Sequence, residues 1–336
     1  MDLLDKLYSK NKPAIEREMA LSVPRNKEPA EVYGLIWEFL DLGGKRFRPL
    51  LCLTAARAAC VGRMPEAQAL KSALPAAAAI ELFHNFTLIH DDIEDASFLR
   101  RGKPCLHVRY GLPLAINAGD GLFMMVLKAT LRIEEKKRWQ AQGWLVDALT
   151  SVLEGQAIEL SWYRNKTFDL TEKDYERMAG GKTAALIEAS TKVGAYLGGG
   201  DEAAVNSLAR YGRLIGLAFQ IQDDVLNLVG NEKDYKKEIG GDIREGKRTV
   251  MVIHALSHLA PSDAKKLKQI LSSQKAGKDE IAWAIQKMEK SGSIRHASGM
   301  AARLVNDAVS SLSILPSSGA KSELERIAKY IISRLR

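Results

Sequence analysis

Apolar residues recur three and four positions apart along almost the whole chain, and no segment alternates as a β-strand does between turn residues. Residues 32–42, VYGLIWEFLDL, illustrate the spacing, and the glycines at positions 43 and 44 end it. No linker or low-complexity tract marks a boundary. The pattern predicts an all-α bundle of about a dozen helices, folded as one domain over residues 1–336.

We expect these helices over residues 32–42, 49–61, 75–95, 113–132, 151–160, 174–197, 201–229, 250–260, 262–272, 278–290, 293–312 and 322–336. Pro75 and Pro113 suit the first turn of a helix, where the missing N–H is not needed. Gly198-Gly199-Gly200 and residues 231–241 are expected to be loops.

The helix expected over residues 75–95 ends in a cluster of carboxylates, HDDIED at 90–95. Asp91 and Asp95 lie one turn apart on one face, whereas Asp92 is turned away by about 100°. Like charges four residues apart repel by a few tenths of a kcal/mol. A bound Mg²⁺ would offset that repulsion. Arg100 and Arg101 follow the cluster, and the guanidinium group of each can bind a phosphate through two hydrogen bonds. For this cluster alone, an ordinary solvated helix end remains the alternative.

A second cluster, DDVLN at residues 223–227, repeats the spacing of the first with Asn227 in the last place. Gln220 lies one turn before Asp224 on the same side of the expected helix. Two carboxylate clusters, Asp223-Asp224 and the first one, each end an apolar helix and are followed by basic residues. We interpret them as two walls of one metal-filled cavity.

The segment GGKRFRP at residues 43–49 joins two expected helices and carries three cations. Its glycines, including Gly44, free the backbone. The next helix adds amide donors, so Lys45 and Arg48 fit an anion site. An ordinary basic loop is the alternative.

Gly180-Gly181-Lys182-Thr183 resembles the end of a nucleotide-binding P-loop, but position 176 holds Glu176 and no strand precedes it. We therefore interpret Lys182 and Thr183 as phosphate ligands in a helical bundle. Lys237 and Lys247 extend the basic lining after the second cluster, although solvated lysines are the alternative for each.

Glu81-x-x-His84 has the spacing of a di-iron bundle ligand pair, but no second copy exists among the six histidines, so di-iron is rejected. His84 lies near the Asp91 face. We keep two interpretations, a phosphate-facing His84 and a buried, hydrogen-bonded one.

The bulk composition narrows the class of protein. The net charge of +8 is spread along the chain without a dense basic tract, so we expect small, highly anionic substrates and no nucleic-acid partner. The three cysteines form no disulfide framework or metal spacing. No apolar run reaches the ~18 residues of a membrane span, and the N-terminus lacks a signal peptide pattern. These features predict a cytoplasmic protein.

Four motifs in order, GGKRFRP, HDDIEDASFLRRGKP, GGKTAAL and FQIQDDVLNLVG, resemble the trans-isoprenyl diphosphate synthases over roughly residues 30–250. The chain is most similar to archaeal-type, short-chain geranylgeranyl diphosphate synthases. The resemblance implies an isoprenoid synthase fold, a helical bundle around a central cavity, and a homodimer. It implies a Mg²⁺-dependent prenyltransferase that condenses isopentenyl diphosphate with dimethylallyl, geranyl or farnesyl diphosphate, giving mainly geranylgeranyl diphosphate.

The resemblance also implies roles for single residues. Asp91, Asp92 and Asp95 form the first aspartate-rich motif and Asp223 and Asp224 the second, with Asp91, Asp95 and Asp223 binding about three Mg²⁺ ions. The allylic diphosphate would contact Arg100, Lys182, Thr183, Gln220, Lys237 and Lys247. Isopentenyl diphosphate would bind to Lys45, Arg48, His84 and Arg101, close to Gly44. Asn227, where many relatives have Asp, is a neutral ligand, and we expect no direct metal role for it.

Chain length is expected to depend on the residues just before Asp91, which lie deeper along the helix by about 1.5 Å per residue. In the family, bulk four, five or eight positions before Asp91 stops elongation, and here Thr87, Phe86 and Phe83 hold those positions. Phe86 without an aromatic residue at 87 resembles the twenty-carbon pattern. A helical wheel instead puts Thr87 about 40°, Phe83 about 80° and Phe86 about 140° from Asp91, so both phenylalanines remain candidates.

Three alternatives remain for the function. The product could be farnesyl diphosphate, or geranylfarnesyl diphosphate and longer. A class I terpene cyclase also uses DDxxD on a helical bundle, but it needs no second diphosphate site such as Lys45, Arg48 and Arg101. A non-catalytic partner subunit would have lost acidic positions, and only Asn227 departs.

Overall fold

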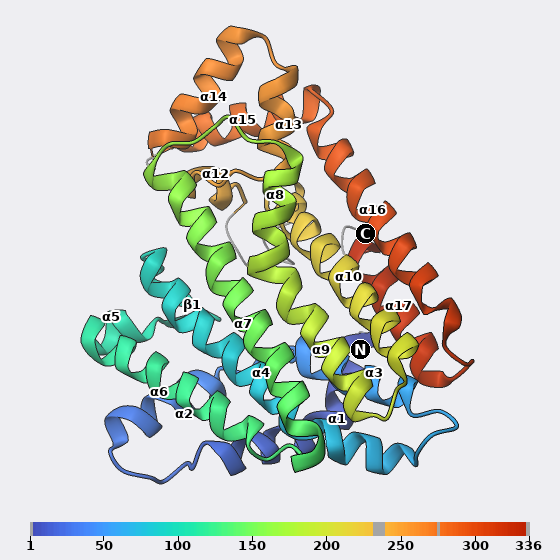
Figure 1. Cartoon of the computed structure of the whole chain (residues 1–336). Helices are drawn as coiled ribbons and strands as arrows, with labels where there is room; N and C mark the ends of the chain where they lie inside the picture. The colour runs from blue at the N-terminus through green and yellow to red at the C-terminus, as the bar shows by residue number, and fades with distance from the viewer. Residues whose placement is uncertain (1–2, 231–238, 274–275, 334–336) are drawn as a thin grey trace. The chain divides into compact units, whose positions relative to one another are not determined.

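The computed structural model describes residues 3–230, 239–273 and 276–333 (Figure 1). The chain forms two compact units. Unit 1 comprises Met1–Val146, Ala189–Ala209 and Ile314–Leu324, and unit 2 comprises Asp147–Glu188, Arg210–Ser313 and Glu325–Arg336.

Helices make up nearly all of the regular structure in the described ranges. They are α1 (Leu3–Ser22), α2 (Ala30–Asp41), α3 (Phe47–Ala59), α4 (Glu66–Glu94), α5 (Leu106–Tyr110), α6 (Leu112–Thr130), α7 (Glu135–Arg164), α8 (Glu172–Ala179), the π-helix η1 (Gly180–Ala184), α9 (Ala185–Leu197), α10 (Glu202–Val229), α12 (Gly241–Glu245), α13 (Val250–His258), α14 (Pro261–Ser273), α15 (Lys278–Lys290), α16 (Ser293–Ser311), the 3₁₀-helix η2 (Leu312–Ile314) and α17 (Gly319–Ser333). The all-α prediction is confirmed.

One small sheet was not predicted. Strands β1 (Leu99–Arg100) and β2 (Lys103–Pro104) pair antiparallel directly after the first acidic cluster. The turn between them has Arg101 at φ 52° and Gly102 at φ 78°. The hairpin is too short to show a strand period, because only two residues pair on each side.

Helix α4 is the central element of unit 1, and it packs against α1, α3 and α6 (Figure 1). Its middle is rich in alanine, and residues 76–79 are all buried, which allows close helix approach. The expected start at Pro75 is wrong, because α4 begins at Glu66 after Pro65 and contains Pro75 in its interior. An interior proline loses one backbone hydrogen bond, and here Pro75 is buried among packed helices, where tertiary contacts outweigh that loss.

Other expected boundaries hold within a few residues, including α6, which has proline in its first turn. The range 151–160 underestimates α7, which runs from Glu135 to Arg164. The range 174–197 is divided by η1, and helices α1, α5 and α12 were not predicted. The loop expected over residues 231–241 lies mostly outside the described residues, and at its end Gly241 begins α12.

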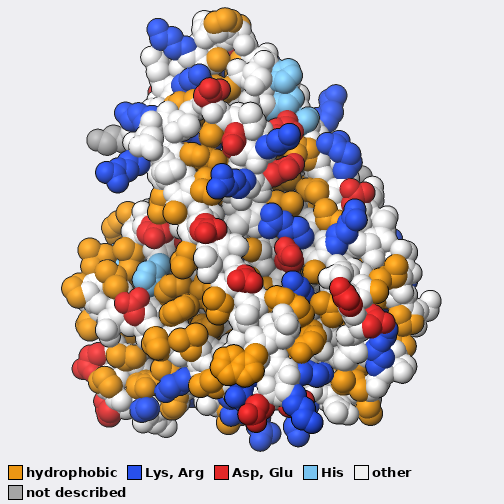
Figure 2. All heavy atoms as spheres, viewed as in Figure 1, with side chains coloured by type: hydrophobic (Ala, Val, Ile, Leu, Met, Phe, Trp, Pro, Cys, Tyr) orange, Lys and Arg blue, Asp and Glu red, His pale blue; other side chains and the backbone are white. Residues whose placement is uncertain are grey.

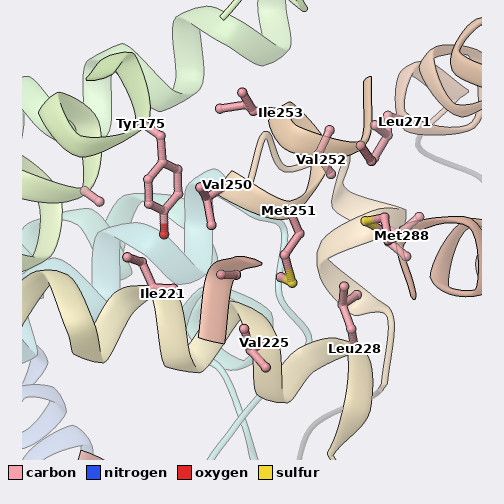
Figure 3. Packing of buried hydrophobic residues seen from close by; sticks show 14 of the residues in the cluster. Tyr175, Ile221, Val225, Leu228, Val250, Met251, Val252, Ile253, Leu271 and Met288 are labelled. Atoms are coloured by element: carbon pink, nitrogen blue, oxygen red, sulfur yellow. The ribbon is translucent and has the colours of Figure 1, made fainter. Parts of the chain in front are cut away.

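The core of unit 2 surrounds α13, which packs against α8, α14, α15 and α16. Buried side chains from α8, α10, α13, α14 and α15 meet there (Figure 3). Tyr175 is fully buried, and its ring lies beside Ile221 and Val250, with the hydroxyl directed toward α10 (Figure 3). This packing fixes α8 against the helix that carries the second acidic cluster.

Two helices, α4 and α6, are long and apolar enough to cross a membrane by length and composition. In α4, 67% of the apolar window is buried inside the structure, as expected of a core helix, whereas in α6 only 39% is buried. The apolar side of α6 is therefore more exposed than that of α4.

Candidate active site

The first acidic motif lies at the end of α4 in unit 1. Asp91 is half-buried and Asp95 is exposed, whereas Asp92 is 2% exposed. Arg100 on β1 donates hydrogen bonds from Nε, at 2.8 Å, and from Nη2 to the Oδ1 atom of Asp92. Asp92, which is turned from Asp91 by about 100° along the helix, is thus buried and paired with Arg100. Asp91 and Asp95 are more exposed.

The β-hairpin is held close to this motif by further contacts. The backbone N–H of Ser97 donates to the carbonyl of Asp92 at 2.9 Å. Cys105, just after β2, is 1% exposed, and burial together with the Asp92 carboxylate raises the pKa of its thiol to about 12. The thiol therefore stays protonated and unreactive at neutral pH.

His84 lies before the acidic motif on α4, and positively charged side chains surround it. Burial lowers its pKa well below the usual value. Four guanidinium groups lower it further, those of Arg48, Arg101, Arg100 and Arg46. His84 is partly buried, and its contact with phosphate remains a prediction.

The segment GGKRFRP contributes two of these cations and is held by a third. Arg101 donates a hydrogen bond to the carbonyl of Gly43, and its guanidinium lies against Gly44, where a Cβ would meet Nη2 at 2.9 Å. Gly44 has φ 135°, which other residues rarely adopt. Burial lowers the pKa of Arg48 to about 10, although Glu81 and Asp91 act to raise it.

Arg46 has a structural role that the sequence did not reveal. Its Nη1 donates to Oε1 of Glu81 at 2.7 Å and its Nη2 to the carbonyl of Leu40 at 2.9 Å. Asn85 donates to the same Glu81 oxygen at 3.0 Å. Burying this ion pair fixes the loop to α4, and it explains why Glu81 can lie inside an apolar helix.

Three aromatic rings form a cluster beside the motif. Phe83 and Phe86 on α4 have ring centroids 5.4 Å apart, and both lie against Phe123 of α6, at 6.2 Å and 5.3 Å. Phe83 is fully buried and Phe86 is half-buried. Thr87 donates its hydroxyl to the carbonyl of His84 at 2.8 Å. Phe123 was missed, because only packing of α6 on α4 brings it here.

In unit 2, Lys182 and Thr183 lie in the π-helix η1. A Cβ on Gly155 of α7 would lie 2.1 Å from the backbone nitrogen of Lys182, and one on Gly216 of α10 would lie 2.6 Å from the Cα of Ala184. Both α7 and α10 therefore touch η1 backbone to backbone at glycines. π-Helical turns are rare and recur at functional sites, so this one sets the position of Lys182 and Thr183.

A chain of hydrogen bonds connects η1 to the second acidic motif. Thr183 donates to Oε1 of Gln220 at 2.6 Å, and the Gln220 amide donates to Oδ1 of Asp224 at 2.8 Å. The Tyr175 hydroxyl donates to the other Asp224 oxygen at 2.7 Å. Burial, with a contribution from Asp242, raises the pKa of Asp224 to about 8.

Two lysines of unit 2 are bound to carboxylates. Lys182 donates a hydrogen bond to Oε2 of Glu159. Lys247 donates to Oδ1 of Asp242 at 2.8 Å and lies 2.9 Å from Oε2 of Glu245. Burial acts to lower the pKa of Lys247, but these carboxylates raise it well above its usual value. The ammonium of Lys247 therefore stays charged.

Asn227 is buried, and two of its oxygen atoms accept hydrogen bonds from backbone N–H groups. Its side-chain oxygen accepts a hydrogen bond from the N–H of Asp242 at 3.0 Å, and its carbonyl accepts from Gly240 at 2.7 Å. This oxygen thus fixes the start of α12.

The predicted residues fall into two sets, one in each unit. Unit 1 contains Gly44, Lys45, Arg48, Phe83, His84, Phe86, Thr87, Asp91, Asp92, Asp95, Arg100 and Arg101. Unit 2 contains Lys182, Thr183, Gln220, Asp223, Asp224 and Lys247, and Lys237 lies outside the described residues. Glu159 was missed, although its spacing of four from Gly155 places both on one face of α7.

The comparisons with known proteins agree with the motifs. The polyprenyl synthetase family model matches residues 29–288, so the chain belongs to the polyprenyl synthetase family. A short chain isoprenyl diphosphate synthase of Methanothermobacter thermautotrophicus is 41% identical over 296 residues, 88% of each chain. Other relatives are named geranylgeranyl and geranylfarnesyl diphosphate synthases.

Solved structures give the same result. The geranylgeranyl pyrophosphate synthetase of Pyrococcus horikoshii Ot3 has a TM-score of 0.89 at 36% identity, covering 98% of both chains. The geranylgeranyl pyrophosphate synthase of Corynebacterium glutamicum, complexed with isoprenyl diphosphate and magnesium, has a TM-score of 0.86 at 25% identity, covering 99% of this chain and 100% of that one. The predicted trans-prenyltransferase class is confirmed.

Proposed function

We propose that the protein is a Mg²⁺-dependent prenyltransferase that extends allylic diphosphates with isopentenyl diphosphate to geranylgeranyl diphosphate. One observation carries this proposal. Arg100 is bonded to Asp92 and Arg101 to the carbonyl of Gly43, so cations of the hairpin and of the GGKRFRP loop lie at the end of α4 that carries Asp91. Concentrated cations beside carboxylates suit a diphosphate ester, because the cations bind phosphate oxygens and the carboxylates bind its metal.

The unit 1 cations would bind isopentenyl diphosphate through Lys45, Arg48, His84 and Arg101. The allylic diphosphate would be bound by Arg100 and by the unit 2 residues Lys182, Thr183, Gln220 and Lys247, together with Lys237. The family match supports this assignment, because the matched residues 29–288 include all of the residues named here.

The carboxylates fit Mg²⁺ by their chemistry. Mg²⁺ prefers hard oxygen ligands and is usually held by one or two carboxylates plus substrate phosphates. Asp91 and Asp95, one turn apart at the end of α4, and Asp223 on α10 would hold it. When bound, Mg²⁺ neutralises charge on the departing diphosphate. Among the described residues, no group of three His, Cys, Asp or Glu forms a preassembled metal cage, so substrate oxygens would complete the coordination.

The chain's own residues would then act in three ways. Lys182 and Lys247 would stabilise the negative charge that grows on the leaving diphosphate. Apolar walls would exclude water, which would otherwise react with the allylic cation. The double bond of isopentenyl diphosphate attacks that cation, and the proton lost afterwards goes to the departed diphosphate.

The exposed apolar side of α6 supports a homodimer. Leu112, Ile116 and Met124 on α6 and Leu131 just after it are between 41% and 58% exposed. Figure 2 shows hydrophobic side chains gathered over α5 and α6. Burying this side against a second copy would remove it from water. Replacing Ile116 and Met124 together with Glu should convert a dimer to a monomer in size-exclusion chromatography with light scattering. Lys290→Glu, at an exposed lysine of α15, is the control.

A cytoplasmic location agrees with the cysteines at 52, 60 and 105, which are free and buried.

The decisive experiment is incubation of the purified protein with isopentenyl diphosphate, each allylic diphosphate and Mg²⁺, followed by chromatography of the dephosphorylated products. We expect mainly the twenty-carbon alcohol, and a large loss of turnover in Lys182→Ala. A terpene cyclase would release hydrocarbons without consuming isopentenyl diphosphate. A non-catalytic subunit would form no product, and either result would overturn the proposal.

A further inference from the structure

Glu159 on α7 is a buried acid that the roles described so far do not use. It is 7% exposed, and its Oε2 atom accepts a hydrogen bond from the ammonium of Lys182. A buried carboxylate is costly unless it is paired and hydrogen-bonded. Its burial on α7 therefore calls for a reason beyond packing.

The backbone itself determines that Glu159 meets Lys182. Gly155 lies one turn before Glu159 on the same face of α7, and a Cβ there would lie 2.1 Å from the Lys182 nitrogen. On the other side, a Cβ on Gly181 would lie 2.7 Å from the carbonyl oxygen of Ser151. Two helices in backbone contact have little freedom to slide, so the distance between the two side chains is fixed by the fold.

The π-helical turn adds to this control. Lys182 lies in η1, between α8 and α9, where the wider turn changes the direction of side chains relative to an α-helix. The neighbouring Thr183 is bound to Gln220, so this side of the turn is also fixed. The bond to Glu159 orients the flexible end of the Lys182 side chain.

The negative charge of Glu159 also acts on a second lysine, Lys247. Burial acts to raise the pKa of Glu159, but Lys182 and Lys247 lower it by more, so the carboxylate is ionised at neutral pH. Glu159 in turn contributes to the raised pKa of Lys247. One carboxylate thus acts on both of the described lysines that the proposed function assigns to the allylic diphosphate.

We propose that Glu159 is a positioning residue for the allylic diphosphate: it holds the ammonium of Lys182 in the orientation that binds the leaving diphosphate. An ammonium has three donors, and directing one toward Glu159 restricts where the other two point. The inference rests on the proposed function, because it needs an allylic diphosphate at Lys182. It adds a residue outside the four sequence motifs to the reaction.

Removal of the carboxylate should affect kcat and KM differently. In Glu159→Gln, the volume is kept but the negative charge is lost, so the ammonium is no longer held in one direction. We expect kcat to fall by roughly 10- to 100-fold, as for a misplaced catalytic group. The KM for the allylic diphosphate should stay within about twofold or fall, because an anion that repels the substrate is gone. A purely structural role would instead lower the melting temperature and reduce the amount of active enzyme without this separation.

A double-variant cycle tests whether Glu159 acts through Lys182. The kcat of Glu159→Gln with Lys182→Ala should match that of Lys182→Ala alone, because a positioning residue has nothing left to position. Glu159→Asp keeps the charge but draws it back by one methylene, so it should keep the wild-type melting temperature and lose part of kcat. It serves as the second variant if Glu159→Gln does not fold. Glu154→Gln, an exposed acid on the same helix, is the matched control and should behave as wild type.

The outcomes separate the two proposals. A wild-type enzyme that forms no product from isopentenyl and allylic diphosphates overturns both. An active wild type with an unchanged kcat in both Glu159→Gln and Glu159→Asp overturns only the positioning role. Full additivity of the Glu159 and Lys182 substitutions overturns it as well, because the two residues would then act independently.

Discussion

Arg100 directs two N–H groups at one oxygen of Asp92, and the other oxygen, Oδ2, is buried without a hydrogen-bond partner among the described residues. The middle carboxylate of the first motif is therefore neutralised inside the protein. Asp91 and Asp95, turned away on the helix, keep the exposure that a metal and substrate would need. One motif thus combines a structural ion pair with two proposed metal ligands, and substitution should separate the two roles.

Asp92→Asn should destabilise the protein more than Asp95→Asn does. Breaking a mostly buried ion pair leaves the Arg100 guanidinium without its partner, which costs about 3 kcal/mol. Asp95 is exposed, so Asp95→Asn should leave the free energy of unfolding within about 0.5 kcal/mol of wild type. Urea unfolding measures both values.

The same pair of variants should differ in their need for Mg²⁺. Asp95→Asn should lose turnover and need a higher Mg²⁺ concentration for half-maximal activity, because one proposed ligand is neutral. Equal unfolding free energies for the two variants, or unchanged Mg²⁺ dependence in Asp95→Asn, would contradict the division of roles.

Gly155→Ala should displace Lys182, because the added methyl group would press on the backbone of η1. Its Cβ would lie 2.1 Å from the backbone nitrogen of Lys182, so α7 or η1 must move. Misplacing a catalytic group by about 1 Å can cost roughly 100-fold in rate, and overpacking costs about 1–3 kcal/mol of stability. Gly143→Ala on the same helix is the control, because apart from its chain neighbours and the backbone of its own helix no described atom lies within 4 Å of its Cβ position. That control should be neutral or stabilising by up to about 1 kcal/mol, and a similar result for both variants in turnover and thermal unfolding assays would refute the close contact.

Phe86→Ala should lengthen the product. Phe86 is half-buried and packs against Phe83 and Phe123, so its removal opens space beside the first motif. Phe83→Ala should lengthen the product too, but Phe83 is fully buried, so it should also lose about 3–5 kcal/mol of stability. Chromatography of dephosphorylated products measures the shift. Phe98, which is 76% exposed in the loop before β1, provides the control Phe98→Ala. Unchanged product length in both test variants would show that these rings do not limit elongation.

Acidification should destabilise the protein through His84. Its folded-state pKa is lowered by burial and by neighbouring arginines, so the unfolded chain binds a proton more readily than the folded one. The contribution to stability is therefore complete above about pH 6.5 and is lost as the pH falls below that value. His84→Gln cannot titrate and should lose less unfolding free energy than wild type between pH 7.5 and 5.5, as measured by urea unfolding. An equal loss in the two proteins would mean that His84 is not the group responsible.

The motifs could be found from the sequence because each lies within one short segment. Asp91 and Asp95, or Gln220 and Asp224, are related by a single helical turn, and that spacing alone places them on one face. Periodicity likewise predicted most helices and the all-α class. It failed at Pro75, because a proline normally begins a helix, and the packing that keeps this one inside α4 is not visible in a local pattern.

The pairings between segments could not be predicted. Glu159 and Lys182 are 23 residues apart, and Arg46 and Glu81 are 35 apart. Nothing in the spacing of either pair indicates that they meet. The glycines at positions 155 and 216 also look like ordinary interruptions of helical sequence until their neighbours are seen to touch η1.

The sequence by itself determined the helical class, the two acidic motifs, the basic residues near them and membership in the polyprenyl synthetase family. Only the tertiary structure decided which carboxylate is paired internally, that η1 interrupts the helix carrying Lys182, and that Glu159 holds that lysine. The reason is physical: local periodicity specifies which face of a helix a side chain occupies, whereas the partner opposite that face depends on how distant segments pack.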